Sequence, residues 1–388
     1  GVASTGDKYF RFYGDGTPCG EYQPNMNADI FTPNVVVSSP NANCGSTNAW
    51  RINVPNLNSN VVFKTDGQND GIDKTVAFVI QGTVQSVSSV TRDITNVFPG
   101  QNVTVTANLS GSLSTGQGVY LRYTSNNYTN STVVAMTGSG TSYTATIPAS
   151  LNTPGTAVSY YIFTSGNTGP ATDGSDADLY TINLNNNGGS NYSYTVANGW
   201  TTNAAGNWGT ASTWTANAIP PTNTNLGIVT INHAVTQNTD ALVSSLVINN
   251  LGTLSGTANT LTINNNTSGT NISNSGTLNL SGTHTISFAG TATHTISGVV
   301  NLNNVSTTSG INFGTGSTIN GTFTINSGGF VSVNAPTYGA NSTLVYNTGG
   351  AYGVSAEWTA NVITGRGVPN NVTISSASTN LNFGSSNQ

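Results

Sequence analysis

Apolar residues along the chain alternate with polar ones in short runs, which is the period-two pattern of half-buried β-strands. In the run Asn102–Leu109 the apolar positions are Val103, Val105, Ala107 and Leu109. Gly, Asn, Ser and Thr separate such runs, as expected for tight turns, and almost no stretch has the 3.6-residue period of a long amphipathic helix. The pattern predicts an all-β protein.

The spacing of the runs divides the chain into three segments. Residues 1–85 predict a small β-sandwich, and residues 86–196 have the regular strand and turn spacing of an immunoglobulin-like or fibronectin III-like β-sandwich. Residues 197–388 have shorter runs, and the fragment Thr-His-Thr-Ile-Ser occurs at 283–287 and again at 293–297. Short strands, polar corners and imperfect repetition predict a parallel β-helix, with further β-sandwiches as the alternative. The chain stops in mid-pattern, so we expect the natural β-helix to continue.

Composition excludes several functions. Charged residues are only 5% of the 388 residues and the formal net charge is −5, so nucleic acid is not an expected partner. No apolar run approaches the roughly 18 residues that a membrane span needs. Within residues 197–388 the only charged residues are Asp240, Glu357 and Arg366. Glycoside hydrolysis normally needs two carboxylates close together at the scissile bond. These charged residues are well scattered along the segment, so we expect no enzyme and no catalytic residues here.

The two cysteines, Cys19 and Cys44, lie in Pro/Gly/Asn-rich stretches of the first segment. A disulfide between them would stabilise the fold by roughly 3 kcal/mol, because it restricts the unfolded chain. Two buried free thiols are the alternative. A disulfide indicates an oxidising compartment, so we expect an extracellular protein.

The sharpest local motif is the acidic loop from Asp66 to Asp73. Asp66, Gln68 and Asp70 are spaced two apart and a glycine follows, as in the first half of a calcium loop. The twelfth position is Ala77 in place of a bidentate Glu, so Asp73, backbone carbonyls or water would complete the site. Calcium is the one cofactor expected, and an Asp/Gly hairpin turn is the alternative.

Two other groups of ionisable residues have a structural and a functional interpretation. Asp173, Asp176 and Asp178 either bind a cation or form a solvated loop. His284 and His294 occupy equivalent places in the repeated fragment. They either pack in the core, which we favour, or bind a transition metal between neighbouring coils.

Four tryptophans, Trp50, Trp200, Trp208 and Trp214, are candidate glycan contacts, because exposed rings of this kind stack on sugars. The alternative is that they fill the sandwich and solenoid cores or cap the β-helix. The choice depends on their burial, which the sequence does not determine.

Threonine pairs of the form Thr-x-Thr raise one further hypothesis, an ice-binding solenoid. They occur at Thr260–Thr262, Thr283–Thr285 and Thr293–Thr295. Ice binding needs a flat and regular threonine array, and the irregular spacing of the runs argues against it.

Several runs resemble known secreted proteins. The run Trp208–Trp214, followed by Ile219–Pro221 and Ile228–Thr236, resembles the opening of β-helical segments in large secreted proteins of Bacteroidetes. The run Pro154–Tyr161 resembles the immunoglobulin-like modules found beside them. The resemblance covers roughly residues 86–388 and implies export by the type IX secretion machinery and display on the cell surface. It implies glycans or proteins outside the cell as partners.

These features predict a secreted cell-surface adhesin or structural stalk that binds surfaces or glycans through its β modules. The alternative is an accessory, carbohydrate-binding region of a larger secreted polysaccharide-degrading enzyme.

Overall fold

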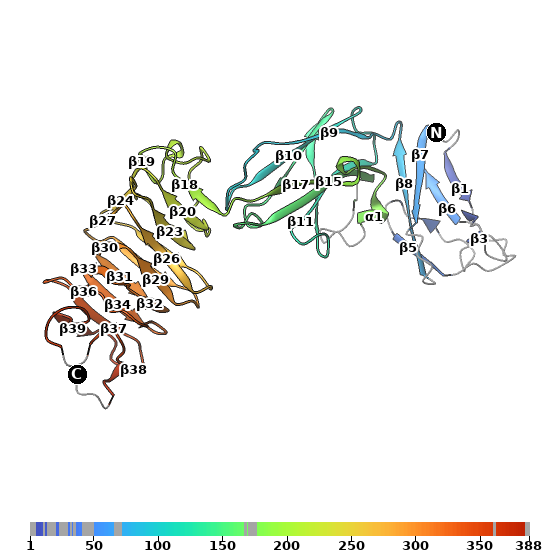
Figure 1. Cartoon of the computed structure of the whole chain (residues 1–388). Coiled ribbons are helices and arrows are strands. Elements are labelled where there is room, and N and C mark those ends of the chain that lie inside the picture. The colour runs from blue at the N-terminus through green and yellow to red at the C-terminus, as the bar shows by residue number, and fades with distance from the viewer. Residues whose placement is uncertain are drawn as a thin grey trace. The chain divides into compact units, whose positions relative to one another are not determined.

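The computed structural model describes residues 50–65, 72–166, 177–359 and 362–384, with short runs and single residues at 5–10, 12–13, 21–22, 30–31, 33, 36–40 and 169. These residues form strands almost throughout, so the all-β prediction is confirmed (Figure 1). None of the described helices is long and apolar enough to cross a membrane. The chain divides into two compact units: Gly1–Thr95, Asn102–Pro148 and Ala157–Thr195 form the first, and Asn96–Gln101, Ala149–Thr156 and Val196–Gln388 form the second.

The first unit begins with two small sheets built around β6 (Trp50–Val54) and β8 (Ile72–Gln81). Ile52 and Val54 of β6 are buried against Ala77 of β8, so the two sheets share a core. The remaining strands of this part are β1 (Gly6–Phe10), β2 (Phe12–Tyr13), β3 (Glu21–Tyr22), β4 (Ile30–Phe31), β5 (Val36–Pro40) and β7 (Ser59–Thr65).

Strand β8 is buried on both of its faces. Val76, Phe78 and Ile80 point away from β6 and pack against Leu179 of the short helix α1 (Ala177–Tyr180). This second core joins the part of the chain before residue 85 to the sandwich that follows, within one compact unit.

The sandwich consists of two antiparallel sheets, in the orders β13-β14-β10-β9 and β12-β11-β15-β16, with β17 also pairing with β15. Alternate residues of β10 are buried as the sequence pattern predicts, and burying one such aliphatic side chain stabilises the fold by about 1.5–3 kcal/mol. The elements are β9 (Val87–Arg92), β10 (Val103–Leu109), β11 (Gln117–Thr124), β12 (Thr132–Ala135), β13 (Thr137–Ser139), β14 (Ser142–Ile147), β15 (Ala157–Gly166), β16 (Asn183–Asn185), the 3₁₀ turn η1 (Asn187–Gly189) and β17 (Tyr192–Thr195).

The second unit is a solenoid of three seven-stranded sheets, here called faces 1, 2 and 3, whose strands stack in parallel (Figure 1, yellow to red). Face 1 is β18 (Gly199–Thr201), β20 (Ile228–Ile231), β23 (Ser245–Ile248), β26 (Gly269–Asn274), β29 (His294–Ser297), β32 (Gly310–Asn312) and β35 (Phe330–Val331). Face 2 is β19 (Gly206–Asn207), β21 (Ala234–Thr236), β24 (Thr253–Gly256), β27 (Thr277–Leu280), β30 (Val299–Leu302), β33 (Gly316–Ile319) and β36 (Thr337–Tyr338). Face 3 is β22 (Ala241–Val243), β25 (Thr260–Asn264), β28 (Thr285–Ala289), β31 (Asn304–Thr307), β34 (Thr322–Asn326), β37 (Thr343–Asn347) and β39 (Asn371–Ile374).

The parallel pairing that the predicted β-helix requires is confirmed at every coil-to-coil step of the three faces. Each coil buries its inward residues on those of its neighbours, as a solenoid requires. Two further strands, β38 (Ala351–Gly353) and β40 (Asn380–Asn382), also pair in parallel, and one 3₁₀ turn, η2 (Ala211–Thr213), lies in the first coil.

Two runs that the sequence suggests as single strands are each divided by a corner. The run Leu242–Ile248 becomes β22 and β23, because Val243 and Leu246 are both buried although they are three residues apart. The run His294–Val299 ends at Gly298, whose φ of 92° and close approach to the Asn274 carbonyl exclude a side chain. A corner therefore changes which alternate residues point inward. A strict two-residue alternation does not predict that change.

Candidate functional site

The predicted calcium loop and disulfide lie largely outside the described residues. This applies to Asp66, Gln68 and Asp70 and to Cys19 and Cys44, and both sites remain predictions. For Asp73 only the backbone is described, and it pairs with Ser39 in the ladder between β5 and β8. In the described part of the chain, no group of three His, Cys, Asp or Glu side chains lies close enough to hold a metal.

The tryptophans of the solenoid lie in its core. Trp200, Trp208 and Trp214 have at most 1% of their surface exposed, so they have no free ring face for a sugar. The Trp208 and Trp214 rings meet edge to face at 4.8 Å, and the Trp214 Nε1 donates to the Trp208 carbonyl at 2.7 Å. Phe98 packs 5.3 Å from the Trp200 ring and covers this end of the core. For Trp50 only the backbone in β6 is described.

Both histidines of the repeated fragment are packed in the solenoid core, but they do not stack on each other. His284 precedes β28 on face 3, and its Nε2 lies 3.1 Å from the Gln237 Oε1. His294 belongs to β29 on face 1, and its Nε2 lies 2.8 Å from the Ala289 carbonyl. Burial lowers the pKa of both, that of His284 to about 4, although the carboxylate of Asp240 partly opposes this. The two imidazoles therefore act as neutral core residues.

Glu357 is the one carboxyl group buried in the solenoid unit, within the described residues. Its Oε1 accepts hydrogen bonds from the Ser355 backbone N at 3.1 Å and from the Tyr346 hydroxyl at 3.3 Å. The Tyr338 hydroxyl donates to the Glu357 carbonyl at 3.0 Å. Burial raises the pKa of Glu357, and these hydrogen bonds to its carboxylate only partly offset that effect. Glu357 therefore lies among tyrosines with a pKa above its ordinary value.

The sequence matches no protein-family model, curated protein or solved structure.

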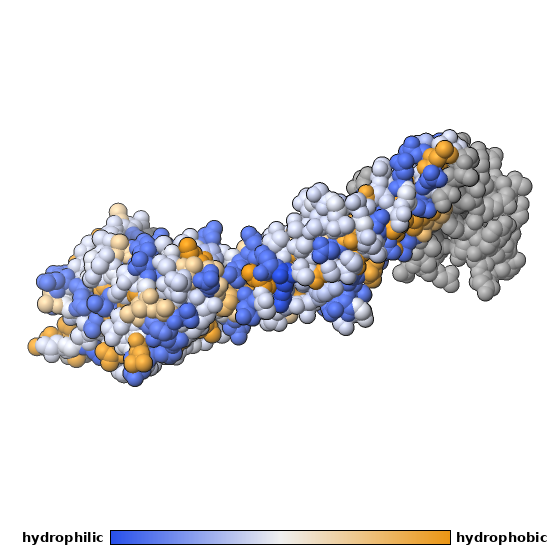
Figure 2. Space-filling view, turned by 90° about the horizontal axis from the view of Figure 1, so that it is seen from above, coloured by the Kyte–Doolittle hydropathy of each residue, from blue (hydrophilic) through white to orange (hydrophobic). Residues whose placement is uncertain are grey.

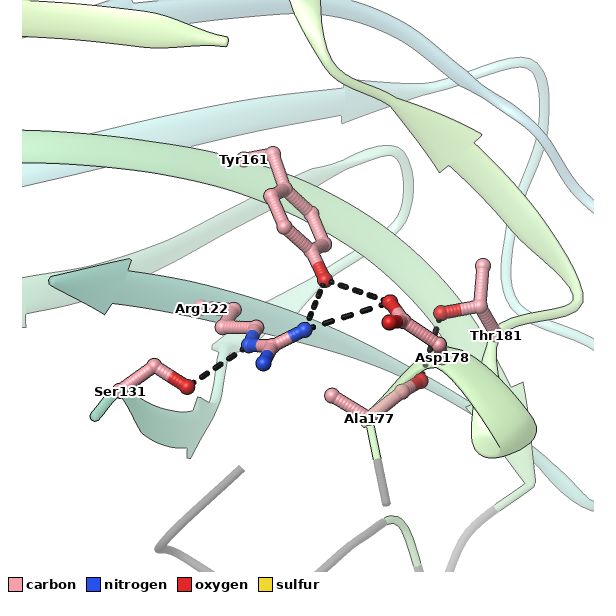
Figure 3. A network of polar contacts seen from close by, with 6 residues as sticks. All are labelled: Arg122, Ser131, Tyr161, Ala177, Asp178 and Thr181. Atoms are coloured by element: carbon pink, nitrogen blue, oxygen red, sulfur yellow. Dashed lines mark hydrogen bonds and ion pairs between the residues drawn. The ribbon is translucent and has the colours of Figure 1, made fainter. Parts of the chain in front are cut away.

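A charged and aromatic site lies on the sheet of β11 and β15 (Figure 3). The Arg122 Nη1 donates to the Tyr161 hydroxyl at 2.7 Å and to the Asp178 Oδ1 at 3.2 Å, and its Nε donates to the Ser131 hydroxyl at 2.8 Å. The guanidinium carbon also lies 5.1 Å from the Tyr128 ring centroid and 5.7 Å from that of Tyr161. Two rings and three polar contacts thus fix one cation in place.

Two atoms of this site have no hydrogen-bond partner among the described residues, the Arg122 Nη2 and the buried Tyr128 hydroxyl. Tyr128 also has a φ of 61°, a conformation that bulky residues seldom adopt. Burial raises the pKa of Tyr128 and of Tyr161, and the positive charge of Arg122 partly opposes this. A guanidinium that packs against two tyrosine rings, with one nitrogen unpartnered among the described residues, is suited to a carboxylate ligand.

Sequence reasoning missed this site because it depends on strand register. Arg122 and Tyr161 are direct partners in the antiparallel pair of β11 and β15, yet they are far apart in the chain. Asp178 appeared only as part of an acidic cluster whose other members, Asp173 and Asp176, lie outside the described residues. The sequence signal for this site is the charged residue Arg122, which lies between buried residues in a mostly apolar strand.

The outward side chains of the solenoid strands are neutral. In the described part of faces 1, 2 and 3 they are mostly Thr, Ser and Asn, with a few apolar residues such as Val299 and Phe330. In Figure 2 the solenoid, which lies at the left as in Figure 1, is largely pale with scattered blue and orange residues. The faces can therefore offer hydroxyl and amide groups to a partner, but no ionic contacts.

Proposed function

We propose that this protein is a non-catalytic adhesin or structural stalk that works outside the cell and contacts surfaces or glycans. What supports this most directly is the set of uncharged, hydroxyl- and amide-rich faces carried on the continuous solenoid core. Stacked strands lie about 4.8 Å apart, so like charges in register would repel at every step, whereas neutral groups can repeat without that cost. Many weak neutral contacts along such a face suit attachment to an extended neutral partner.

The test is retention of the full chain on insoluble neutral glycans at low and at high salt. We expect binding that persists at high salt, because neutral hydrogen-bonding contacts are not screened by ions. Failure to bind any neutral glycan or cell surface, or loss of binding on raising the salt, would contradict the proposal.

The Arg122 site favours a second candidate, an accessory module that binds acidic glycans for a larger secreted enzyme. A uronate carboxylate would replace the exposed Asp178 carboxylate at Arg122, and Tyr128 and Tyr161 would flank it. Binding of a uronate oligosaccharide should weaken with salt and be lost in Arg122→Gln. Retention in that variant would exclude this site.

A further inference from the structure

Face 3 carries an ordered array of side chains that the sequence does not reveal. Residues paired between its strands are separated by very different lengths of chain: 25 residues from Leu261 to Ile286, but 18 from Val305 to Phe323. The strands nevertheless stack in unbroken register, because the corners absorb the difference. Irregular spacing in the sequence is therefore compatible with a regular surface.

Two outward files run along five successive strands of this face, β25, β28, β31, β34 and β37. The first file is Thr260, Thr285, Asn304, Thr322 and Thr343. The second file is Thr262, Ser287, Ser306, Thr324 and Val345. Neighbours within a file lie about 4.8 Å apart, and the two files lie about 6.6 Å apart, two residues along each strand.

Most of these hydroxyls are available to an outside partner. Within the described residues, the hydroxyls of five threonines make no hydrogen bond to the protein: Thr260, Thr262, Thr322, Thr324 and Thr343. Ser306 instead donates to Ser287 at 3.1 Å, which links two neighbouring strands. The array is thus held in place by its own backbone ladder and keeps its hydrogen-bonding capacity for a ligand.

The chemistry of the face restricts what that ligand is. None of the outward residues on these five strands is charged, so an ionic partner gains nothing there. None carries an aromatic ring, so a sugar on this face would be held by hydrogen bonds alone, without stacking. What remains is an array of hydroxyl, methyl and amide groups with a two-dimensional repeat. Ordered water is a partner with such a repeat, since water molecules in ice form a flat lattice with spacings of the same size.

We propose that face 3 binds ice. Each threonine hydroxyl would join the lattice by a hydrogen bond while its methyl group fills the space between lattice waters. An ordered water bound in this way costs little entropy, because it is already immobile in the crystal. The inference is independent of glycan binding, because the adhesive function proposed above does not require ice.

The experiment grows ice slowly from a solution of the full chain and measures how the protein partitions between ice and liquid, together with thermal hysteresis. We expect the wild type to enter the ice. Thr324→Lys, within the second file, should lose that partitioning, because a long charged side chain interrupts the array of hydroxyl and methyl groups. Thr262→Lys should give the same loss at a second position.

The matched control is Thr318→Lys, which changes an outward threonine on β33 of face 2. It should partition like the wild type, and circular dichroism should show that all three variants melt as folded proteins. Exclusion of the wild type from ice, or equal loss in Thr324→Lys and Thr318→Lys, overturns the proposal. Binding to crystalline cellulose or chitin that depends on Thr324, without binding to ice, overturns it too and assigns the face to polysaccharide.

Discussion

The two units of this protein place their charged side chains differently. In the first unit charged residues occur on the strands and meet side chains as well as backbone: Arg122 pairs with Asp178, and Arg92 lies 5.1 Å from the Tyr194 ring centroid and donates to the Ser193 and Thr95 carbonyls. In the described part of the solenoid unit no charged residue lies on a strand of the three faces, and Asp240 and Arg366 are bound by backbone groups. The Asp240 Oδ1 accepts from the Thr260 N at 2.8 Å, and Arg366 donates to the carbonyls of three residues.

The difference follows from geometry. A position on an antiparallel sandwich strand faces different residues on its two neighbours, so opposite charges can be placed side by side. A position in a parallel solenoid recurs on the next coil about 4.8 Å away, so a charge there meets its own equivalents. The described charges of the solenoid, Asp240, Glu357 and Arg366, therefore lie outside the strands of the three faces.

The largest effect on stability is expected from a substitution in the solenoid core, which should destabilise the solenoid unit and leave the sandwich unchanged. Phe323→Ala removes a fully buried ring that packs edge to face 5.1 Å from Phe313. It should lower the free energy of unfolding of the solenoid by about 3–5 kcal/mol, because a cavity replaces the ring. Urea denaturation followed by circular dichroism measures this. A sandwich transition shifted as much as the solenoid transition would show that the two units unfold together.

The next prediction concerns the stability of the fold at low pH. The folded pKa of His284 is lowered from 6.5 to about 4, so the unfolded chain takes up a proton first as the pH falls. Stability is complete above pH 6.5 and decreases towards pH 4, where the loss is about 3 kcal/mol. Melting curves across this pH range should show the slope, and His284→Gln should reduce it. An unchanged slope in the variant would assign the effect to other groups.

Glu357 should produce the opposite pH dependence. Its folded pKa lies above the ordinary value of 4.5, so the unfolded chain releases its proton first as the pH rises. Stability is complete below pH 4.5 and is lost as the pH rises through the folded pKa. The same melting experiments should show a fall that Glu357→Gln removes. If Glu357→Gln melts with the wild-type pH profile, the carboxyl group is not protonated in the fold.

The smallest effect is expected at the ion pair of the first unit. The Asp178 side chain is 90% exposed, so water and salt screen its attraction to Arg122. Asp178→Asn should change the stability of that unit by less than about 1 kcal/mol. Arg122→Gln should cost more, because it also removes contacts to Tyr161 and Ser131. Equal losses of stability in the two variants would contradict the expectation that Arg122 contributes more than its ion pair with Asp178.

The alternation of residues predicted strands and their inward faces well. The alternating runs at 228–231 and 277–280, for example, are the strands β20 and β27. Corners were harder, because Ser244 and Gly298 shift the phase of the alternation and so divide runs that look continuous. Such a shift is decided by contacts with the neighbouring coil, which local sequence does not contain.

Functional residues could be predicted only where the members of a site are close together in the sequence. A threonine pair such as Thr260–Thr262 is visible in the sequence, but its partners on the next strand, Thr285 and Ser287, depend on the length of the corner between them. Arg122 and Tyr161 likewise meet only through the register of β11 and β15. The burial of Trp214 follows from a whole coil and not from its neighbours in the chain.

The unequal corners have an evolutionary consequence. Because coils of 18 and 25 residues present their strands in the same register, residues can be inserted or deleted at a corner without moving a face. Duplication and trimming can therefore vary the outer loops while the stacked surface is inherited intact. The solenoid separates the part of its surface that is free to diversify from the part that is constrained to stay periodic.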